Sequence, residues 1–358
     1  MKRISISKPS LTEAEKNAVM AVLDSGFLAQ GPKTAAFEER FAAMHGVKHA
    51  IAVSNGTCAL QVALLANGVG PGDQVITSPF TFMATANAIL FTGAQPVFVD
   101  IEPDTFNMNP DLIEAAITPR TKAILPVHLY GHICDMDKIC AIAEKHGLRI
   151  IEDACQSVMA TYHGKYAGSF GTGTFSFYAT KNLMTGEGGM VTTNDDVVAD
   201  NSRMIRSHGM RQRYYHERVG YNFRITDIQS AIGLAQLDRL ELLTSLRRKN
   251  AEYLGAHIHS VITPVAREGY GHVWHQYTVR VNNGKNRDAA VKQLHDAGID
   301  TGIYYPVPVH KQQSLVGLID ESSLPVAEQM ADEVMSLPVH PSLTDEDLET
   351  IVEEVNKL

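Results

Sequence analysis

The chain has 358 residues, 44% of them hydrophobic and 20% charged, which is the composition of a globular protein large enough for two domains. Its 40 acidic residues outnumber its 31 basic ones, for a net charge of -9, and no basic cluster stands out, which argues against a nucleic-acid partner. No apolar run is long enough to cross a membrane, and the first residues turn polar too soon for a secretory signal.

The four cysteines form no C-x-x-C pair, and the fifteen histidines show no metal-ligand spacing around them. Four cysteines in so long a chain do not make a disulfide framework. We therefore expect reduced thiols, a cytoplasmic location and no zinc site.

Two helices are predicted at the start of the chain. The capping-box pattern Ser10-Leu11-Thr12-Glu13 predicts a helix that Gly26 ends. Gly31-Pro32 begins a second helix, which closes at Gly46. The loop between them has no packing period, so it either lines a pocket or is a plain connector.

Short strands and helices alternate from there to the middle of the chain. The apolar runs are continuous rather than alternating, which is typical of parallel strands covered on both faces, and this predicts a doubly wound α/β sheet. We expect strands at 50–53, 74–77, 96–99, 123–127 and 149–153. We expect helices after 54–57, near Thr81, at 109–117 and at 136–146.

The pattern changes after Asp195. A helix at 197–207 is followed by a polar stretch, 208–224, which has no amphipathic period. Thr226 then caps a long helix that continues past Leu243 into a smaller domain. We expect a large domain at 1–240 and a small C-terminal domain at 241–358. The small domain should contain strands at 276–281 and 303–305 and helices at 287–297 and 345–355.

Two strand ends carry the residues with the most distinctive chemistry. The strand at 149–153 ends in Asp153, and the apolar run at 174–178 leads to Lys181 in a glycine-flanked loop. A pyridoxal phosphate (PLP) site needs an amine for the cofactor's aldehyde and a carboxylate for its pyridine nitrogen. Lys181 and Asp153 could supply them. On these two residues alone, an ordinary strand end with a solvated lysine is the simpler interpretation.

Nearby polar and aromatic residues allow a similar choice. The turn at 54–57 lies between a strand and a helix, where free N–H groups favour phosphate, and Gly56 permits close approach of the backbone. Phe82 could stack on a flat ring if Lys181 and Asp153 are accepted. Gln156 could reach a ring hydroxyl or cap a turn, and Ser176 could bind phosphate or have no role. The absence of nucleotide-binding glycine motifs disfavours a triphosphate or dinucleotide site.

Taken together, these motifs resemble the DegT/DnrJ/EryC1/StrS family of PLP-dependent sugar aminotransferases over nearly the whole chain. The resemblance rests on ten segments in family order: Gly31-Pro32 with Phe37-Glu38, 54–57, 79–82, 98–100, 128–131, 152–157, 175–178 with Lys181, 186–189, Tyr221-Asn222-x-Arg224, and Tyr305-Pro306-x-Pro308-x-His310. It implies a type I aminotransferase fold, in which a large domain with a mostly parallel seven-stranded sheet is joined to a smaller C-terminal α+β domain.

The resemblance also implies roles for individual residues. Lys181 would hold PLP covalently and later move the proton, and Asp153 would pair with the pyridine nitrogen. Gln156 would reach the ring hydroxyl, and Phe82 would stack on the ring. Phosphate would be bound by Gly56, Thr57, Ser176 and, from the partner subunit, Asn222. The last role implies an obligate homodimer with shared active sites.

The implied reaction moves an amino group from an amino acid, L-glutamate by family analogy, to a nucleotide-linked keto-sugar. Some members have a histidine in place of the lysine and dehydrate sugars, so Lys181 favours aminotransfer here. The segment 185–189 resembles that of members that aminate C-4, such as perosamine synthases. The alternatives are a non-catalytic PLP-binding regulator and another fold-type I enzyme, either a lyase or a desulfurase. A desulfurase needs a nucleophilic cysteine on a mobile loop, and none of the four stands in an obvious one.

Overall fold

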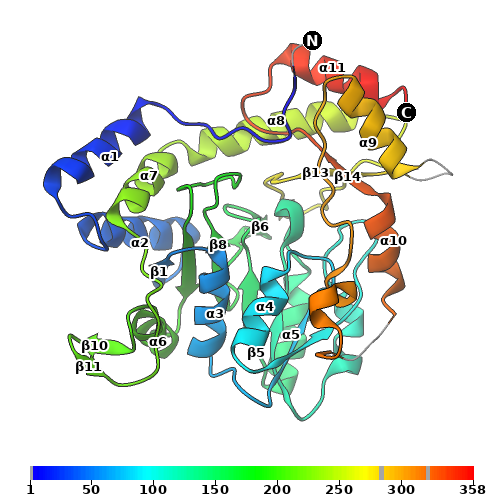
Figure 1. Cartoon of the computed structure of the whole chain (residues 1–358). Helices are drawn as coiled ribbons and strands as arrows, with labels where there is room; N and C mark the ends of the chain where they lie inside the picture. The colour runs from blue at the N-terminus through cyan, green and yellow to red at the C-terminus, as the bar shows by residue number, and fades with distance from the viewer. Residues whose placement is uncertain (1–2, 282–285, 320–322) are drawn as a thin grey trace.

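The structure is a computed structural model, which describes residues 3–281, 286–319 and 323–358. A seven-stranded sheet forms its centre, with the strand order β1-β9-β8-β5-β4-β2-β3 (Figure 1). β9 runs antiparallel to both of its neighbours, and the other pairs of adjacent strands are parallel. The predicted mostly parallel, seven-stranded sheet is confirmed. The strands are β1 (His49–Val53), β2 (Gln74–Thr77), β3 (Gln95–Phe98), β4 (Thr121–Leu125), β5 (Arg149–Asp153), β8 (Thr172–Ser176) and β9 (Gly189–Thr193).

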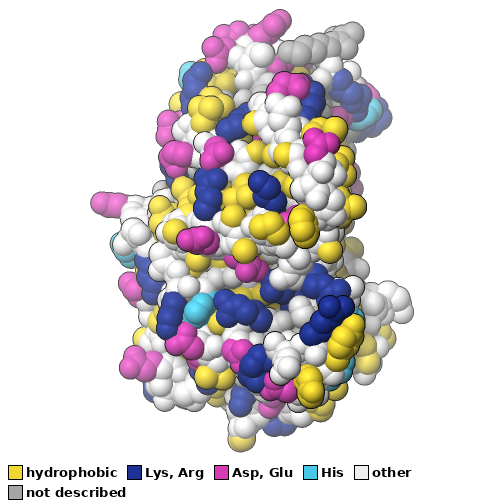
Figure 2. Space-filling view, turned by 90° about the vertical axis from the view of Figure 1, so that its left-hand side faces the viewer, with side chains coloured by type: hydrophobic (Ala, Val, Ile, Leu, Met, Phe, Trp, Pro, Cys, Tyr) yellow, Lys and Arg dark blue, Asp and Glu magenta, His cyan; other side chains and the backbone are white. Residues whose placement is uncertain are grey.

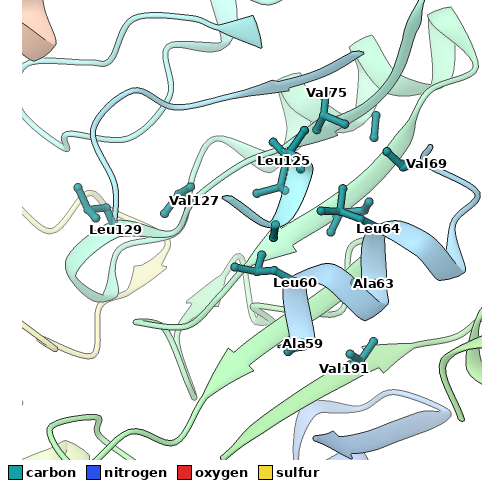
Figure 3. Close-up of a cluster of buried hydrophobic side chains, with 14 of the residues drawn as sticks. Ala59, Leu60, Ala63, Leu64, Val69, Val75, Leu125, Val127, Leu129 and Val191 are labelled. Atoms are coloured by element: carbon teal, nitrogen blue, oxygen red, sulfur yellow. The ribbon is translucent and has the colours of Figure 1, made fainter. Parts of the chain in front are cut away.

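Helices cover both faces of this sheet because successive strand residues point to opposite sides. On one face, α3 packs Leu60 and Leu64 against Val75, Leu125 and Val191 of the strands (Figure 3). On the other face, α2 and α5 cover a second buried cluster. The helices of the large part of the fold are α1 (Glu13–Ser25), α2 (Pro32–His45), α3 (Gly56–Ala66), α4 (Ala84–Phe91), α5 (Met136–His146), α6 (Asp196–Arg206) and α7 (Asp227–Leu237).

A third buried cluster belongs mainly to the C-terminal residues, which lie together at the top of Figure 1. Its elements are α8 (Leu240–His257), β13 (Tyr277–Arg280), α9 (Arg287–Asp296), β14 (Val334–Leu337) and α11 (Asp345–Val355). Ile4 joins this cluster from the other end of the chain, whereas α10 (Pro325–Glu333) packs on the central sheet. The division at residue 240 stays a prediction. Among the described residues, no helix is both long and apolar enough to cross a lipid bilayer.

Two small sheets lie outside these layers. One is a hairpin of β10 (Met210–Gln212) and β11 (Tyr215–His216), which projects from the body at the lower left of Figure 1. It occupies the polar stretch for which no element was predicted. The other sheet joins β6 (Thr161–Tyr162), β7 (Lys165–Tyr166) and β12 (Tyr270–Gly271).

Several predicted elements differ from the structure. Residues 109–117 form two short 3-10 turns, Pro110–Leu112 and Glu114–Ala116, instead of a helix. Thr118 precedes Pro119, and a residue before proline disfavours the helical conformation, so the segment cannot extend. Residues 303–305 form no strand, because the following prolines lack the N–H groups that a sheet needs.

The helix boundaries also needed two corrections. Thr12, not Ser10, is the N-cap of α1, and its capping box uses the side chain of Glu15, which lies three residues later. The predicted long helix breaks at Asp238 into α7 and α8. At this break, the guanidinium group of Arg239 donates hydrogen bonds to the side chains of Ser10 and Glu15. These bonds connect the α7–α8 junction to the start of α1.

Candidate active site

A cavity of about 910 Å³ lies at the carboxyl ends of the central strands, where open α/β sheets bind ligands. Its walls come from the start of α3, the loop before α4, the ends of β5 and β8, and the C-terminal segment near residue 305. The predicted site residues that line it are Gly56, Thr57, Phe82, Asp153, Gln156, Ser176 and Lys181. Asn222 is the predicted residue that does not.

Lys181 is half-buried in this cavity, and its backbone N–H donates to the carbonyl of Tyr178 at 2.8 Å. Burial lowers the pKa of Lys181, against the opposing effect of the nearby Asp153 carboxylate. A lowered pKa increases the fraction of neutral amine, the form that attacks a carbonyl carbon. The residue therefore has the chemistry of a Schiff-base lysine.

Asp153 ends β5, and its side chain is buried at the cavity wall. Its Oδ2 accepts from the hydroxyl of Thr85 at 2.8 Å, and its Oδ1 accepts from the N–H of Cys155 at 3.2 Å. Both donors stabilise the ionised carboxylate. An anion held in this way can keep a nearby ring nitrogen protonated.

The turn before α3 forms a cradle at one end of the cavity. Asn55 caps the helix by accepting from the N–H of Cys58 at 2.9 Å. A Cβ added to Gly56 would lie 2.7 Å from Cβ of Ser176 and 3.2 Å from Sγ of Cys155. Only glycine leaves this space open, and the free N–H groups of the helix start beside the serine hydroxyl suit a phosphate.

Gln156 is held by contacts from two distant parts of the chain. Its Oε1 accepts from the N–H of Tyr130 at 2.9 Å, and its Nε2 donates to the hydroxyl of Tyr305 at 3.2 Å. This leaves one proton of the amide for a ligand. The ring of Phe82 lies 6.3 Å from that of Tyr305 and is 61% exposed, so its face is open to a flat group.

Sequence reasoning gave no site role to Thr85, His275 or Tyr305, which also line this cavity. Nδ1 of the His275 ring lies 3.3 Å from Oδ1 of Asn182, the residue after Lys181. Burial, with Lys181 and Arg247 nearby, lowers the pKa of His275 well below its usual value. Tyr305 belonged to a recognised motif, but no sequence signal pointed to Thr85 or His275.

Asn222 is exposed, forms a β-bridge with Ser207 and does not line the cavity, whereas its neighbour Phe223 does. A single subunit therefore does not bring Asn222 to the predicted phosphate site.

The residues present fit PLP: an amine of lowered pKa, an anchored carboxylate, an open aromatic face and a helix-start cradle share one cavity. Within the described ranges, no group of His, Cys, Asp or Glu side chains is suited to a metal ion.

Comparisons with known proteins agree with this fit. Residues 9–356 match the model of the DegT/DnrJ/EryC1/StrS aminotransferase family. A solved structure of S. venezuelae DesV, in complex with a ketimine intermediate, is 40% identical, with a TM-score of 0.95 over 100% of this chain and 98% of that one.

Three curated relatives are similar over most of their length. GDP-perosamine synthase of Caulobacter vibrioides is 42% identical over 99% of this chain and 98% of its own. UDP-2-acetamido-2-deoxy-3-oxo-D-glucuronate aminotransferase of Pseudomonas aeruginosa is 45% identical over 91% and 90%. A protein of Geobacillus stearothermophilus named "Pleiotropic regulatory protein" is 45% identical over 96% and 95%.

Proposed function

We propose a reaction for this chain from one premise: it belongs to the DegT/DnrJ/EryC1/StrS aminotransferase family. It is therefore a PLP-dependent aminotransferase with the type I fold. The proposed reaction moves the amino group of L-glutamate to C-4 of a nucleotide-linked keto-sugar. The observation that carries it is the convergence of Lys181, Asp153 and the Gly56 cradle in one large cavity.

Bound PLP supplies an aldehyde for the amine and an electron sink for the negative charge that develops at the donor's Cα. In the proposed mechanism, Nζ of Lys181 would hold PLP at its aldehyde carbon and, with an amino donor in the site, would accept the proton from the donor's Cα. Its lowered pKa supports this role, because a neutral amine is needed to accept that proton.

The remaining residues would bind and orient. Asp153 would hold the pyridine nitrogen protonated, and Gln156 would donate to the ring hydroxyl. The phosphate would lie at the start of α3, held by Gly56, Thr57 and Ser176. Phe82 would cover the ring once the site is filled, which accounts for its open face in the free protein.

The nucleotide sugar is supported by the names of two relatives, which act on GDP- and UDP-linked sugars. Those names point to different sugars, so the position of amination rests on the resemblance of segment 185–189 to C-4 aminating members. Glutamate rests on family analogy alone.

A homodimer with shared sites is part of the proposal. Lys181 is the sole Lys or Arg among the described residues that line the cavity, where the carboxylates of Asp153 and Glu187 also lie. A nucleotide diphosphate and a dicarboxylic donor bring several negative charges, so further cations have to come from outside the subunit. The segment 208–224 carries arginines and the exposed Asn222.

The surface around that segment supports the same proposal. On the hairpin and the residues after it, Tyr214 is 74% exposed and Val219 is 83% exposed, and Phe27 after α1 is 68% exposed. Figure 2 faces the side of the molecule where α1 and the hairpin lie, and it shows apolar side chains interspersed with Lys and Arg. A partner subunit on this face would cover these exposed apolar groups. The cytoplasmic location stays a prediction.

The alternatives receive less support. A desulfurase needs a reactive thiolate, but burial raises the pKa of both cavity thiols, Cys58 and Cys155, which keeps them protonated. The alternative of a non-catalytic regulator is raised by the name of one relative, the "Pleiotropic regulatory protein" of Geobacillus stearothermophilus. However, it would have no need for a lysine of lowered pKa and an anchored carboxylate in the same cavity.

The proposal is tested with purified protein, PLP, ¹⁵N-labelled glutamate and a panel of GDP-, UDP- and dTDP-linked 4-keto and 3-keto sugars, with mass spectrometry of the products. We expect ¹⁵N in the amino sugar made from a 4-keto substrate. Labelling of 3-keto substrates alone would overturn the position. Labelling of no nucleotide sugar, by a protein that converts glutamate to 2-oxoglutarate, would overturn the substrate class.

A further inference from the structure

Two threonine hydroxyls in the cavity have no part in the roles described above. Oγ1 of Thr85 donates to Oδ2 of Asp153 at 2.8 Å, and Oγ1 of Thr81 lies 3.0 Å from Oγ1 of Thr85. Both threonines are buried and both line the cavity. Thr85 lies in the first turn of α4, where negative charge is favoured and a β-branched side chain has few rotamers.

The chemistry of Thr81, Thr85 and Asp153 decides which group is the donor in each of these two hydrogen bonds. An ionised carboxylate only accepts hydrogen bonds, so Thr85 must use its single hydroxyl proton on Asp153. In the contact between the two hydroxyls, Thr81 is therefore the donor. Each carboxylate oxygen of Asp153 has one fixed donor, because the N–H of Cys155 bonds the other oxygen. Together these donors set the plane of the carboxylate.

The fixed orientation of the Asp153 carboxylate matters because a lysine lines the same cavity. Lys181 lines the same space, yet within the described residues no ion pair of 4.0 Å or less joins it to Asp153. Opposite charges in a partly dry cavity attract each other strongly. A carboxylate that was free to rotate would turn toward the ammonium group and leave the position where it can meet a ring nitrogen.

We propose that Thr85, supported by Thr81, is a positioning residue that holds the Asp153 carboxylate toward the ring nitrogen of PLP and away from Lys181. This inference rests on the role proposed above for Asp153. It assigns the threonines a part in preparing the site before the cofactor binds.

The buried titratable groups near Lys181 and Asp153 are uncharged around neutral pH. Burial raises the pKa of the Cys155 thiol and of the Tyr305 phenol, and it lowers the pKa of the His275 imidazole. Glu187 lines the cavity but is exposed to solvent, which screens it. A change in the proton affinity of Lys181 therefore reports mainly on where the Asp153 carboxylate lies.

The test measures the rate at which the full-length chain, freed of cofactor, condenses with added PLP, followed by absorbance across a pH series. Only the neutral amine of Lys181 reacts, so the pH of half-maximal rate follows its pKa. Thr85→Val removes the hydroxyl and keeps the shape. Thr85→Ser restores the hydroxyl. Thr77→Val is the matched control, because Thr77 is equally buried and donates to the carbonyl of Leu125 at 2.9 Å.

In Thr85→Val, we expect the freed carboxylate to approach Lys181, which raises the pKa of the amine. The half-maximal rate should move upward by roughly one pH unit, and the rate at neutral pH should fall roughly tenfold. Thr85→Ser and Thr77→Val should stay within about twofold of the wild type. Identical behaviour of Thr85→Val and Thr77→Val would overturn the inference, as would a failure of Thr85→Ser to restore the rate.

If Thr85→Val does not fold, Thr81→Val takes its place. It removes only the outer hydroxyl, so it should show an upward shift of the same sign and smaller size, and no shift would overturn the inference. These measurements use no sugar. A wild-type protein that aminates no nucleotide sugar would contradict the proposed function and leave this test valid.

Discussion

At the scale of single residues, two groups of opposite charge are held apart in one cavity. Lys181 has a lowered pKa because it is desolvated, and Asp153 is bonded at both oxygens. Two groups of opposite charge that line a cavity without pairing are available to a ligand instead of to each other. This separates the site from an ordinary buried ion pair.

The first prediction concerns Asp153. Asp153→Asn keeps the size of the side chain and removes its charge, so the pyridine nitrogen loses the partner that keeps it protonated. PLP should still bind, while turnover with glutamate should fall on the order of 100-fold or more. Asp238→Asn, at an exposed carboxylate bonded to Arg40, serves as the control and should leave turnover unchanged. Turnover near the wild-type value would assign Asp153 a purely structural role.

Some residues of the site could be predicted from the sequence and others could not. Lys181, Asp153 and Gly56 were singled out because each lies at or after the end of a strand, where open α/β sheets bind ligands, and the family resemblance then implied their roles. Thr85 and His275 could not be found in this way. Their roles come from contacts with residues distant in the sequence, such as the bond from Thr85 to Asp153.

At the scale of elements, the start of α3 is the most constrained feature of the site. The helix begins at Gly56, directly against β8, because its N-cap residue Asn55 precedes a residue without a side chain. The backbone of Gly56 approaches Ser176 more closely than a Cβ atom on residue 56 would permit.

This closeness gives the second prediction. Gly56→Ala should weaken PLP binding by roughly tenfold or more, because the new methyl group displaces Ser176 and fills the phosphate cradle. Gly70→Ala is the control, since a Cβ there meets nothing within 4 Å. PLP titration monitored by absorbance measures both variants. Equal affinity in Gly56→Ala and wild type would show that phosphate lies elsewhere.

Prediction of the elements themselves succeeded where local signals were strong. Gly26 ends α1, α2 begins at Pro32, and α5 and α11 match their predicted ranges. β9 and β14 were not predicted, because a strand in the sheet depends on a partner that the local pattern does not reveal. The hairpin of β10 and β11 was missed because its exposed residues have no buried face to set a period.

At the scale of the whole molecule, Lys181 is the one cationic side chain among the described residues that line the cavity. The exposed hairpin and Asn222 lie outside the cavity of their own subunit. A symmetric dimer would let each subunit complete the site of the other.

This arrangement gives the third prediction. Lys181→Ala should be inactive alone, and Asn222→Ala should have greatly reduced activity. When the two are mixed under conditions of subunit exchange, activity should return, because one site of the mixed dimer collects both defects and the other collects neither. Up to about half of the sites in each mixed dimer would then be intact.

Tagged subunits provide the control, since purification through two tags proves that mixed dimers formed. If both residues acted within one chain, every site of the mixed dimer would keep one defect. Mixed dimers without activity would therefore refute the role of Asn222 in the partner's site.

The central claim is that Lys181 is the amine that holds the cofactor, and borohydride reduction tests it most directly. Reduction of the PLP-loaded protein fixes the cofactor to whichever lysine carries it, and peptide mass spectrometry then identifies the residue. We expect the phosphopyridoxyl group on the peptide that contains Lys181, and no labelled peptide in Lys181→Ala. Labelling of a different lysine, or equal labelling in Lys181→Ala, would contradict the account.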